Sequence, residues 1–339
     1  MAGMHSILDM GVSLVPVFIF LAALIYLDTF KLIRLRSILW TIGVGCLVAI
    51  IAFVLNTNIL AVTGWEFTSY SYYGAPFLEE ILKAGYLVYL IRARKIGFMV
   101  DGAIYGFAIG AGFAFVENIY YLQTTENVNV LYWLIRGLGT AMMHGGTTAI
   151  VGIVMKKLSA SRVSINALDV AFGLGIAVVI HSIYNHFFLN PMLSTLVIIV
   201  LLPALISVVF YESEKSTRHW LGLGLDTDLQ LLEMIITGNI AETNIGNYFK
   251  SFQDKFRGEI IADMLCLVRI HVELSIRAKG ILLMRSAGYD IPIEASVREK
   301  FAELQYLRKS IGKTGQLAVA PFLHTSSRDL WQIHLLEKG

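Results

Sequence analysis

The chain has 339 residues, of which 56% are hydrophobic and only 15% are charged, and its mean hydropathy is +0.66. A soluble globular domain does not need that much apolar surface, so the composition indicates a membrane protein. The formal net charge of +2 gives no sign of a nucleic-acid-binding protein. Cys46 and Cys266 offer neither a disulfide framework nor a paired metal motif, so we expect both to be packing residues.

Seven runs of the sequence carry few charges and are each about 17–25 residues long, the length needed to cross the hydrocarbon of a bilayer. No Lys or Arg precedes the first run, so it lacks the charged start of a signal peptide and we expect it to persist as a helix. The sequence therefore predicts an all-α, polytopic bundle over residues 1–211. The expected spans are Met10–Leu27, Ile38–Val62, Tyr72–Ile91, Val100–Leu122, Val130–Met155, Leu168–Leu189 and Met192–Tyr211.

Basic residues gather in alternate loops, after the first, third, fifth and seventh runs, and the other connections carry none. Cytoplasmic loops of membrane proteins carry an excess of Lys and Arg. The pattern predicts a multi-pass protein of the cell membrane with its N-terminus outside and everything after Tyr211 in the cytoplasm. The basic loop residues are Lys31, Arg34, Arg36, Arg92, Arg94, Lys95, Lys156, Lys157, Arg162, Lys215 and Arg218.

Residues 212–339 differ in composition, with 16 Lys or Arg against 16 Asp or Glu. Their apolar residues recur at helical spacing, and Gly238 and Gly288 are expected to end helices. We therefore predict a C-terminal helical domain in the cytoplasm. Binding of a partner is a hypothesis for this domain, but no residue identifies that partner.

The third run contains two adjacent carboxylates and a lysine, Glu79, Glu80 and Lys83. An ionised side chain at the centre of a membrane helix costs at least ~2.5–3.5 kcal/mol, so such residues usually face a polar cavity and carry function. Lys83 lies three or four residues from both acids and can neutralise either. A helix-packing ion pair is the structural alternative, although one acid would suffice for it.

Polar residues in three later spans are candidates for the same site. Glu117 lies in the fourth span, His144 in the fifth, and His181 and Asn185, one helical turn apart, in the sixth. At about 1.5 Å per residue, Glu117 lies roughly 8 Å below the outer end of its span, Glu79 about 10 Å and His181 about 12 Å. These depths favour one layer of functional groups in the outer half of the membrane.

His144 joins this layer only if the hydrocarbon begins at Arg136, because an arginine side chain prefers to reach the interface. It then lies about 12 Å down. Taken singly, His144 or His181 would more often be a residue that forms hydrogen bonds between helices. Their common depth is what favours a functional site.

Such a set suits hydrolysis. His144, His181 and Glu117 can hold Zn²⁺ and leave one position open for water, while Glu79 takes the water's proton as general base. In a metal-free version Glu79 activates water directly, with the histidines as hydrogen-bond donors. The sequence leaves both versions open.

Three further residues are expected to support the reaction. Glu80 and Lys83 would hold the charge and orientation of the general base. Asn185 would donate a hydrogen bond to the oxyanion that forms when a peptide carbonyl is attacked. An ordinary interhelical role for Asn185 is equally compatible with the pattern.

Four motifs occur in order: Glu79-Glu80-Ile81-Leu82-Lys83 (E-E-x-x-K), Phe113 to Glu117 (F-x-x-x-E), His144 in a glycine-rich span, and His181 to Asn185 (H-x-x-x-N). Over about Tyr72–Leu189 the chain resembles PrsW-family intramembrane proteases, relatives of the type II CAAX prenyl proteases and the bacterial Abi group. Those relatives commonly show E-E-x-x-x-R and F-x-x-x-H. The earlier lysine and Glu117 favour the PrsW branch.

The resemblance implies an enzyme that cleaves a peptide bond of a membrane-protein substrate within or near the bilayer. In some members of the family the substrate is a single-span anti-sigma factor, cut on its extracytoplasmic side. The depth of the candidate residues agrees with that side. The family pattern assigns no task to residues 212–339.

Two other functional classes fit parts of the pattern. An ion-coupled transporter would also place Glu, Lys and His in its spans, but it would more often show helix-breaking signals near the midplane, where only Pro76 occurs in the motif spans. A non-catalytic scaffold is the other alternative, since a membrane subunit of γ-secretase resembles this superfamily and serves assembly. The intact Glu79-Glu80 pair favours an enzyme.

Overall fold

The computed structural model describes residues 15, 18–26, 28, 33–124, 135–160, 162, 164–186, 188, 190–289, 291–292, 294–323 and 336. Every regular element within these residues is a helix, which confirms the prediction of an all-α chain for the part that the structure describes. The chain forms two compact units, Met1–Ser159 with Ser164–Ser213, and Ala160–Val163 with Glu214–Gly339. We describe each unit by itself.

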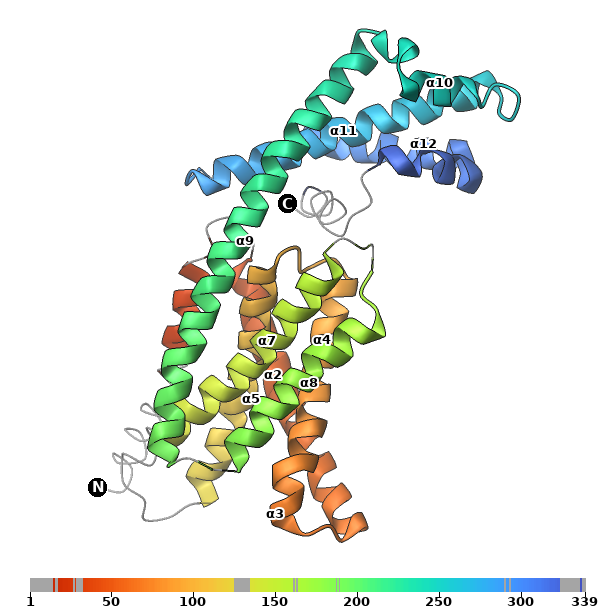
Figure 1. The fold of residues 1–339 in the computed structure, drawn as a ribbon. Helices are drawn as coiled ribbons and strands as arrows, with labels where there is room; N and C mark the ends of the chain where they lie inside the picture. The colour runs from red at the N-terminus through yellow and green to blue at the C-terminus, as the bar shows by residue number, and fades with distance from the viewer. Residues whose placement is uncertain are drawn as a thin grey trace. The chain divides into compact units, whose positions relative to one another are not determined.

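The first unit is a bundle of long helices (Figure 1). Two of them, α4 and α7, are each preceded directly by a turn of π-helix. The elements are α2 (Leu35–Thr63), α3 (Phe67–Ser69), η1 (Tyr70–Gly74), α4 (Ala75–Arg92), α5 (Met99–Thr124), η2 (Ile135–Thr140), α7 (Ala141–Ser159), α8 (Ala167–Asn185) and α9 (Pro191–Ile236).

Five helices are long and apolar enough to cross a membrane: Leu35–Thr63, Met99–Thr124, Gly137–Ser159, Ala167–Asn185 and Met192–Ile236. They correspond to five of the seven predicted spans. The third predicted span contains α4, whose acids and lysine make it too polar for this test. In the first predicted span, residues 15 and 18–26 are described and are helical, and the others lie outside the described residues. The chain is therefore a multi-pass membrane protein, and the number seven stays a prediction.

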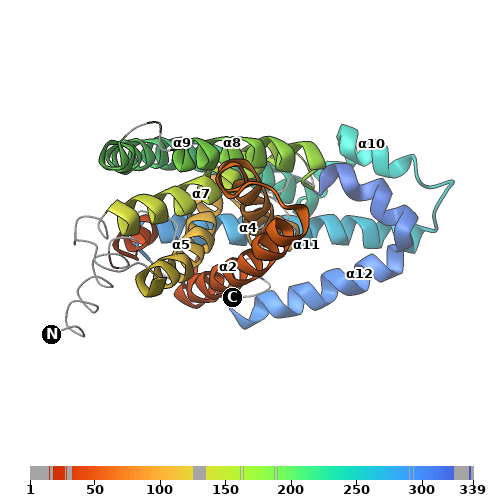
Figure 2. The ribbon, with the colours of Figure 1, turned by 90° about the horizontal axis from the view of Figure 1, so that it is seen from below.

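Helix α5 lies at the centre of the bundle, between α7 and α2 (Figure 2). Its glycines allow this close packing: a Cβ added at Gly106 would lie 2.7 Å from the Cα of Ala149, and one added at Gly110 would lie 2.6 Å from the Cα of Gly145. Small residues let membrane helices approach closely where lipid supplies no hydrophobic driving force. The contact at Gly110 brings α5 against the turn of α7 that carries His144.

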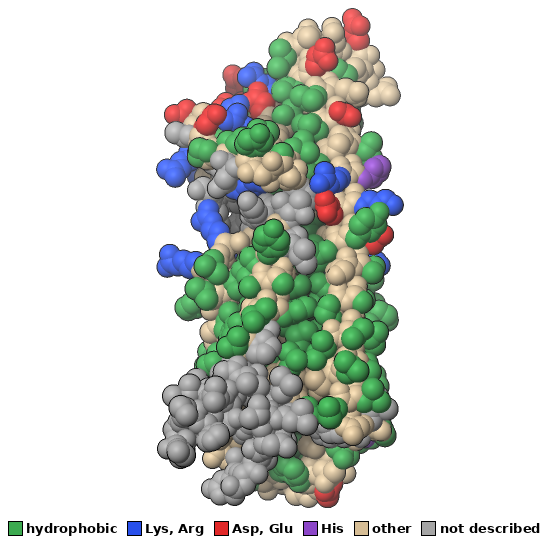
Figure 3. Space-filling view, turned by 90° about the vertical axis from the view of Figure 1, so that its left-hand side faces the viewer, with side chains coloured by type: hydrophobic (Ala, Val, Ile, Leu, Met, Phe, Trp, Pro, Cys, Tyr) green, Lys and Arg blue, Asp and Glu red, His purple; other side chains and the backbone are tan. Residues whose placement is uncertain are grey.

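The outer surface of the first unit is apolar. Large hydrophobic side chains on α2, α8 and α9 are exposed, among them Trp40, Phe172 and Leu201. Figure 3 shows hydrophobic side chains over much of this surface. Such exposure is expected of helices that face lipid.

Helix α9 does not stop where the apolar run ends. The seventh span was expected to end at Tyr211, but the helix continues to Ile236 and contributes residues to both units. The sequence changes from apolar to charged residues after Tyr211, but charged residues are compatible with a helix and do not end it. The first left-handed residue after it is Gly238.

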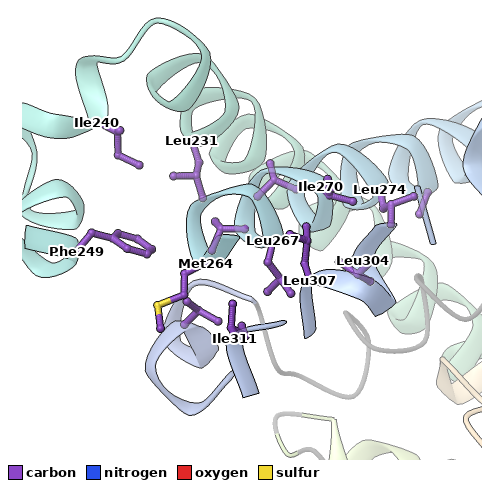
Figure 4. Packing of buried hydrophobic residues seen from close by; sticks show 14 of the residues in the cluster. Leu231, Ile240, Phe249, Met264, Leu267, Ile270, Leu274, Leu304, Leu307 and Ile311 are labelled. Carbon is purple, nitrogen blue, oxygen red and sulfur yellow. The ribbon is translucent and has the colours of Figure 1, made fainter. Parts of the chain in front are cut away.

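The second unit is helical and has its own apolar core (Figure 4). Its core residues include Leu231, Phe249, Leu267 and Leu304. Gly238 and Gly288 have positive φ angles just beyond α9 and α11, which confirms the predicted helix ends. Besides the end of α9, the elements are η3 (Asn239–Glu242), α10 (Asn244–Lys250), α11 (Gly258–Ser286), α12 (Ala295–Val319) and η4 (Ala320–Phe322).

Candidate active site

Glu80 and Lys83 form a fully buried ion pair on α4, with Lys83 Nζ 2.6 Å from Glu80 Oε1. Burying two charges is costly unless additional hydrogen bonds satisfy them. Glu80 Oε1 also accepts a hydrogen bond from Thr147 Oγ1 at 3.2 Å and lies 2.9 Å from His181 Nδ1. A single carboxylate oxygen therefore connects α4 to α7 and α8. Glu80 Oε2 is buried and has no hydrogen-bond partner among the described residues.

His181, buried on α8, is oriented by this carboxylate. Because Glu80 accepts, Nδ1 carries the proton and Nε2 presents its lone pair. Nε2 points toward the second acid of α4 and lies 4.0 Å from Glu79 Oε2. Metal-binding histidines are characteristically held this way, with one ring nitrogen donating to a carboxylate and the other free to ligate.

His144, buried on α7, lies between a lysine and a glutamate. Its Nδ1 is 3.0 Å from Lys83 Nζ and its Nε2 is 2.7 Å from Glu117 Oε2. An ammonium group only donates, so Nδ1 accepts and Nε2 donates to Glu117. The ring packs edge-on against His181, with centroids 4.8 Å apart, and at the same distance from Phe113. Helices α4, α5, α7 and α8 thus converge on one network.

Glu79 is held by two residues that the sequence did not single out. Its Oε1 accepts a hydrogen bond from Asn56 Nδ2 at 3.1 Å, and Asn56 Oδ1 accepts one from Tyr70 OH at 2.7 Å. Helix α2 and the π turn η1 therefore fix one oxygen of Glu79, which leaves Oε2 facing His181. The only sequence signal for this role is that Asn56 interrupts an apolar run.

Thr147 is the third residue that sequence reasoning missed. It lies three residues after His144 on the same face of α7, and its hydroxyl is shared between Glu80 Oε1 and the carbonyl oxygen of His144. Threonine is common in membrane helices, so this position carries no distinctive signal.

Asn185 was expected to point to a reacting carbonyl. Its Nδ2 donates a hydrogen bond to the carbonyl oxygen of Ser71 at 3.0 Å, and Ser182 Oγ donates to that of Tyr72 at 2.6 Å. Both bonds tie α8 to η1, the π turn that precedes α4. In this arrangement Asn185 orients the helices, and its role toward an oxyanion stays a prediction. The side chain of Arg136 lies outside the described residues.

Three groups are suited to hold a metal ion. Glu79, His144 and His181 each offer a ligand atom, and these atoms lie within 4.8 Å of one another. Two imidazole nitrogens and a carboxylate oxygen match the three-ligand set of catalytic zinc sites. Glu117, the ligand expected from the sequence, is the hydrogen-bond partner of His144 Nε2. The network therefore brings both carboxylates to the histidine pair.

An apolar groove of about 680 Å³ lies beside this network, between α7, α8 and α9. Met143, Ile183 and Leu205 are among its lining residues, and Thr147 lines it as well. Because the Thr147 hydroxyl bonds to Glu80, the groove reaches the polar network from the lipid-facing side of the bundle.

One comparison with known proteins identifies the chain. A family model described as "PrsW family intramembrane metalloprotease" matches residues 34–211, more than half of the 339 residues. The matched region contains every residue of the network described above. No curated protein and no solved structure matches the chain.

Proposed function

This chain belongs to the PrsW family of intramembrane metalloproteases, and we propose that it hydrolyses a peptide bond of a single-span membrane protein on the extracytoplasmic side, using Zn²⁺. The observation that carries the proposal is the convergence of Glu79, Glu80, His144 and His181 on one buried network. Ionisable groups inside a membrane are costly, and a network of them is best explained by chemistry.

The residues fit a catalytic zinc site. We assign His144, His181 and Glu117 as ligands and Glu79 as general base. His144 would ligate through Nε2, which requires that its ring proton move to Nδ1 and that Lys83 give up a proton. When bound, the ion supplies a Lewis acid and makes water more acidic. The orientation of His181, with Nδ1 donating to Glu80, supports its assignment because it leaves Nε2 available.

Glu79 is suited to move the proton. Asn56 holds its Oε1, while Oε2 lies 4.0 Å from His181 Nε2 and so faces the side of the ring that is assigned to the metal. Glu79 Oε2 takes a proton from water as the water oxygen bonds to the peptide carbonyl carbon. It returns that proton to the leaving nitrogen as the C–N bond breaks.

Glu80 and Lys83 are positioning residues in this account. Their mutual charge compensation keeps both in the bilayer, and Glu80 fixes the ring of His181. Asn185 retains a second N–H besides the one bonded to Ser71, and we assign that group to the oxyanion.

The groove between α7, α8 and α9 is the proposed seat of the substrate's transmembrane segment. It is apolar, lies among helices that can cross the membrane, and meets the catalytic network at Thr147. An apolar helix that enters there would bring its backbone to the polar groups without passing through water. An anti-sigma factor is the kind of single-span substrate that the family resemblance implies.

Reconstitution tests the proposal. The purified chain is placed in vesicles with single-span substrates and compared with Glu79→Ala and His181→Ala. We expect cleavage by the wild type and its loss in both variants. Continued cleavage by both variants would remove the proposed site, and no cleavage of any substrate would favour a scaffold.

The position of the cut in the substrate tests on which side of the membrane cleavage takes place. Mass spectrometry of the products should place the cut in the extracytoplasmic half of the substrate's span, at the depth of Glu79 and His181. A cut at the cytoplasmic edge would show that the assigned topology or depth is wrong.

A further inference from the structure

A second cavity, of about 560 Å³, lies where α2 begins and α4 ends. Arg36 comes from the first turn of α2 and Lys95 from the loop after α4. Both belong to the basic loop residues that the sequence pattern assigns to the cytoplasmic side. The cavity shares no lining residue with the catalytic network.

The cavity is cationic. No acidic side chain lines it within the part of the chain that the structure describes. Among those residues Arg36 forms no ion pair, and Lys95 Nζ lies 5.5 Å from the centre of the Tyr89 ring, without a carboxylate partner. Two cations that share a hollow repel each other, so an anion between them would stabilise both.

Hydroxyl groups line the same hollow. Tyr105, only 5% exposed, and Tyr86 contribute two phenols to the wall, and Ser37 lines it as well. Thr41 also lines the cavity, and its hydroxyl donates to the carbonyl oxygen of Ser37 within α2 at 2.8 Å. The phenols of Tyr86 and Tyr105, beside an arginine and a lysine, are donors that suit a phosphate group.

The remaining wall is apolar and faces lipid. Leu39 and Trp40 line the cavity and are 59% and 70% exposed. They lie on α2, one of the helices able to cross a membrane. A ligand that fits both halves has an anionic head and a hydrocarbon tail. Basic pockets between membrane helices bind anionic lipid headgroups in this way.

We propose that this cavity binds an anionic phospholipid, with its phosphate between Arg36 and Lys95 and an acyl chain along Leu39 and Trp40. The lipid would join the start of α2 to the end of α4, the two helices that hold Asn56 and Glu79. The site is separate from the proposed catalytic function and does not depend on it.

Three probes separate the sources of phosphate. The full chain, purified in a neutral detergent, is titrated with short-chain phosphatidylglycerol, short-chain phosphatidylcholine and inorganic phosphate. Bound lipid is counted by native mass spectrometry, and thermal unfolding is recorded in parallel. We expect phosphatidylglycerol to remain bound and to raise the unfolding temperature more than phosphatidylcholine does.

The test variant is Arg36→Gln with Lys95→Gln, and the matched control is Arg92→Gln with Lys157→Gln, which removes the same charge from exposed residues that do not line the cavity. Each basic residue near an anionic headgroup is worth about fivefold in affinity, so the test variant should bind about 30-fold more weakly. The control should bind like the wild type. Arg36→Lys with Lys95→Arg keeps the charge and should retain binding, which excludes simple misfolding.

Two results would overturn the proposal. Equal loss of phosphatidylglycerol in the test and control variants would mean that only surface charge matters. Stabilisation by inorganic phosphate without retention of phosphatidylglycerol would mean that the cavity takes a soluble anion instead of a lipid.

Discussion

Each unit of the molecule contains a buried pair of a lysine and a carboxylate, and the surroundings of the two pairs differ. In the first unit Lys83 lies 2.6 Å from Glu80, and in the second Lys279 lies 2.6 Å from Asp228. All four side chains are at most 2% exposed. The geometry of the pair itself therefore does not reveal its role.

The partners of each pair suggest that role. Asp228 accepts a second hydrogen bond from Ser275, and Lys279 lies against the ring of Trp220, so these contacts join α9 to α11. The pair in α4 is instead bonded to both His144 and His181. A buried ion pair bonded to imidazoles can shift protons and hold a ligand, whereas one bonded to a hydroxyl and an aromatic ring holds helices together.

The largest effect is expected from a change in the catalytic network around Glu80. Glu79→Gln should lower the cleavage rate by about 10²–10⁴-fold, because it removes the general base while keeping the shape of the side chain. The variant should retain its metal, whereas Glu117→Gln and His181→Ala should lose it. Metal content measured by elemental analysis beside cleavage rate checks this. Loss of metal from Glu79→Gln with retention in Glu117→Gln would exchange the roles of the two acids.

The next largest effect is expected when the Lys279–Asp228 pair of the second unit is broken. Lys279→Met leaves Asp228 buried without its charge partner and should destabilise the second unit by about 3–5 kcal/mol. Replacing both partners, Asp228→Leu with Lys279→Met, should restore most of this stability. Limited proteolysis of the full chain, with cuts mapped to residues 214–323, measures both. Failure of the double variant to recover would show that Asp228 has a task beyond the pair.

A smaller effect is expected from filling the apolar groove between α7, α8 and α9, which lies beside the catalytic network. Ala204→Trp fills the groove from α9 and should lower kcat/KM for a single-span substrate by about tenfold, since overpacking costs about 1–3 kcal/mol. Val200→Trp, on the same helix at a position that does not line the groove, is the matched control and should leave kcat/KM unchanged. Equal losses in both variants would remove the groove from the substrate's path.

The smallest effect is a pH dependence of the second unit. Partial burial of Glu273 acts to raise its pKa, but hydrogen bonds from Lys300 and Arg269 outweigh it and hold the pKa below the usual 4.5. A carboxylate with a lowered pKa stabilises the fold above its unfolded pKa and loses that contribution as the pH falls through the folded value. Exposed pairs contribute about 1 kcal/mol or less.

Glu273→Gln should therefore be less stable than the wild type at pH 7, and the difference should shrink below the usual glutamate pKa. Unfolding monitored by circular dichroism from pH 7 to pH 3 measures it, with the exposed Glu259→Gln as control. A difference that grows as the pH falls would contradict the assigned direction.

The sequence predicted the membrane class, the helical architecture and the motif residues, because hydrophobic length and charge inside an apolar run are local properties. It also indicated that Glu79, Glu117, His144 and His181 share a depth, and the structure brings them together. Depth follows from counting residues along helices. It does not depend on how the side chains are turned.

The sequence could not predict the hydrogen-bond partners of the site residues, because these depend on how the helices pack. Asn56, Tyr70 and Thr147 are ordinary residues for membrane helices, and their hydrogen bonds exist only because α2, η1 and α7 lie against α4. The hydrogen bond from Asn185 to the Ser71 carbonyl likewise depends on the π turn η1, which cannot be predicted from the spacing of hydrophobic residues. The continuity of α9 from the seventh span into the second unit was not predicted, because hydropathy marks the end of a membrane span and not the end of a helix.

The most direct test compares matched changes in the two buried pairs. The cleavage rate of a reconstituted single-span substrate is measured for Glu80→Gln and Asp228→Asn, each normalised to the amount of folded protein. We predict a loss of at least about 100-fold for Glu80→Gln, because His181 loses its orienting carboxylate, and a rate within about twofold of the wild type for Asp228→Asn, whose effect should be on stability alone. Equal rates for the two variants would contradict the claim that the network around Glu80 is the active site.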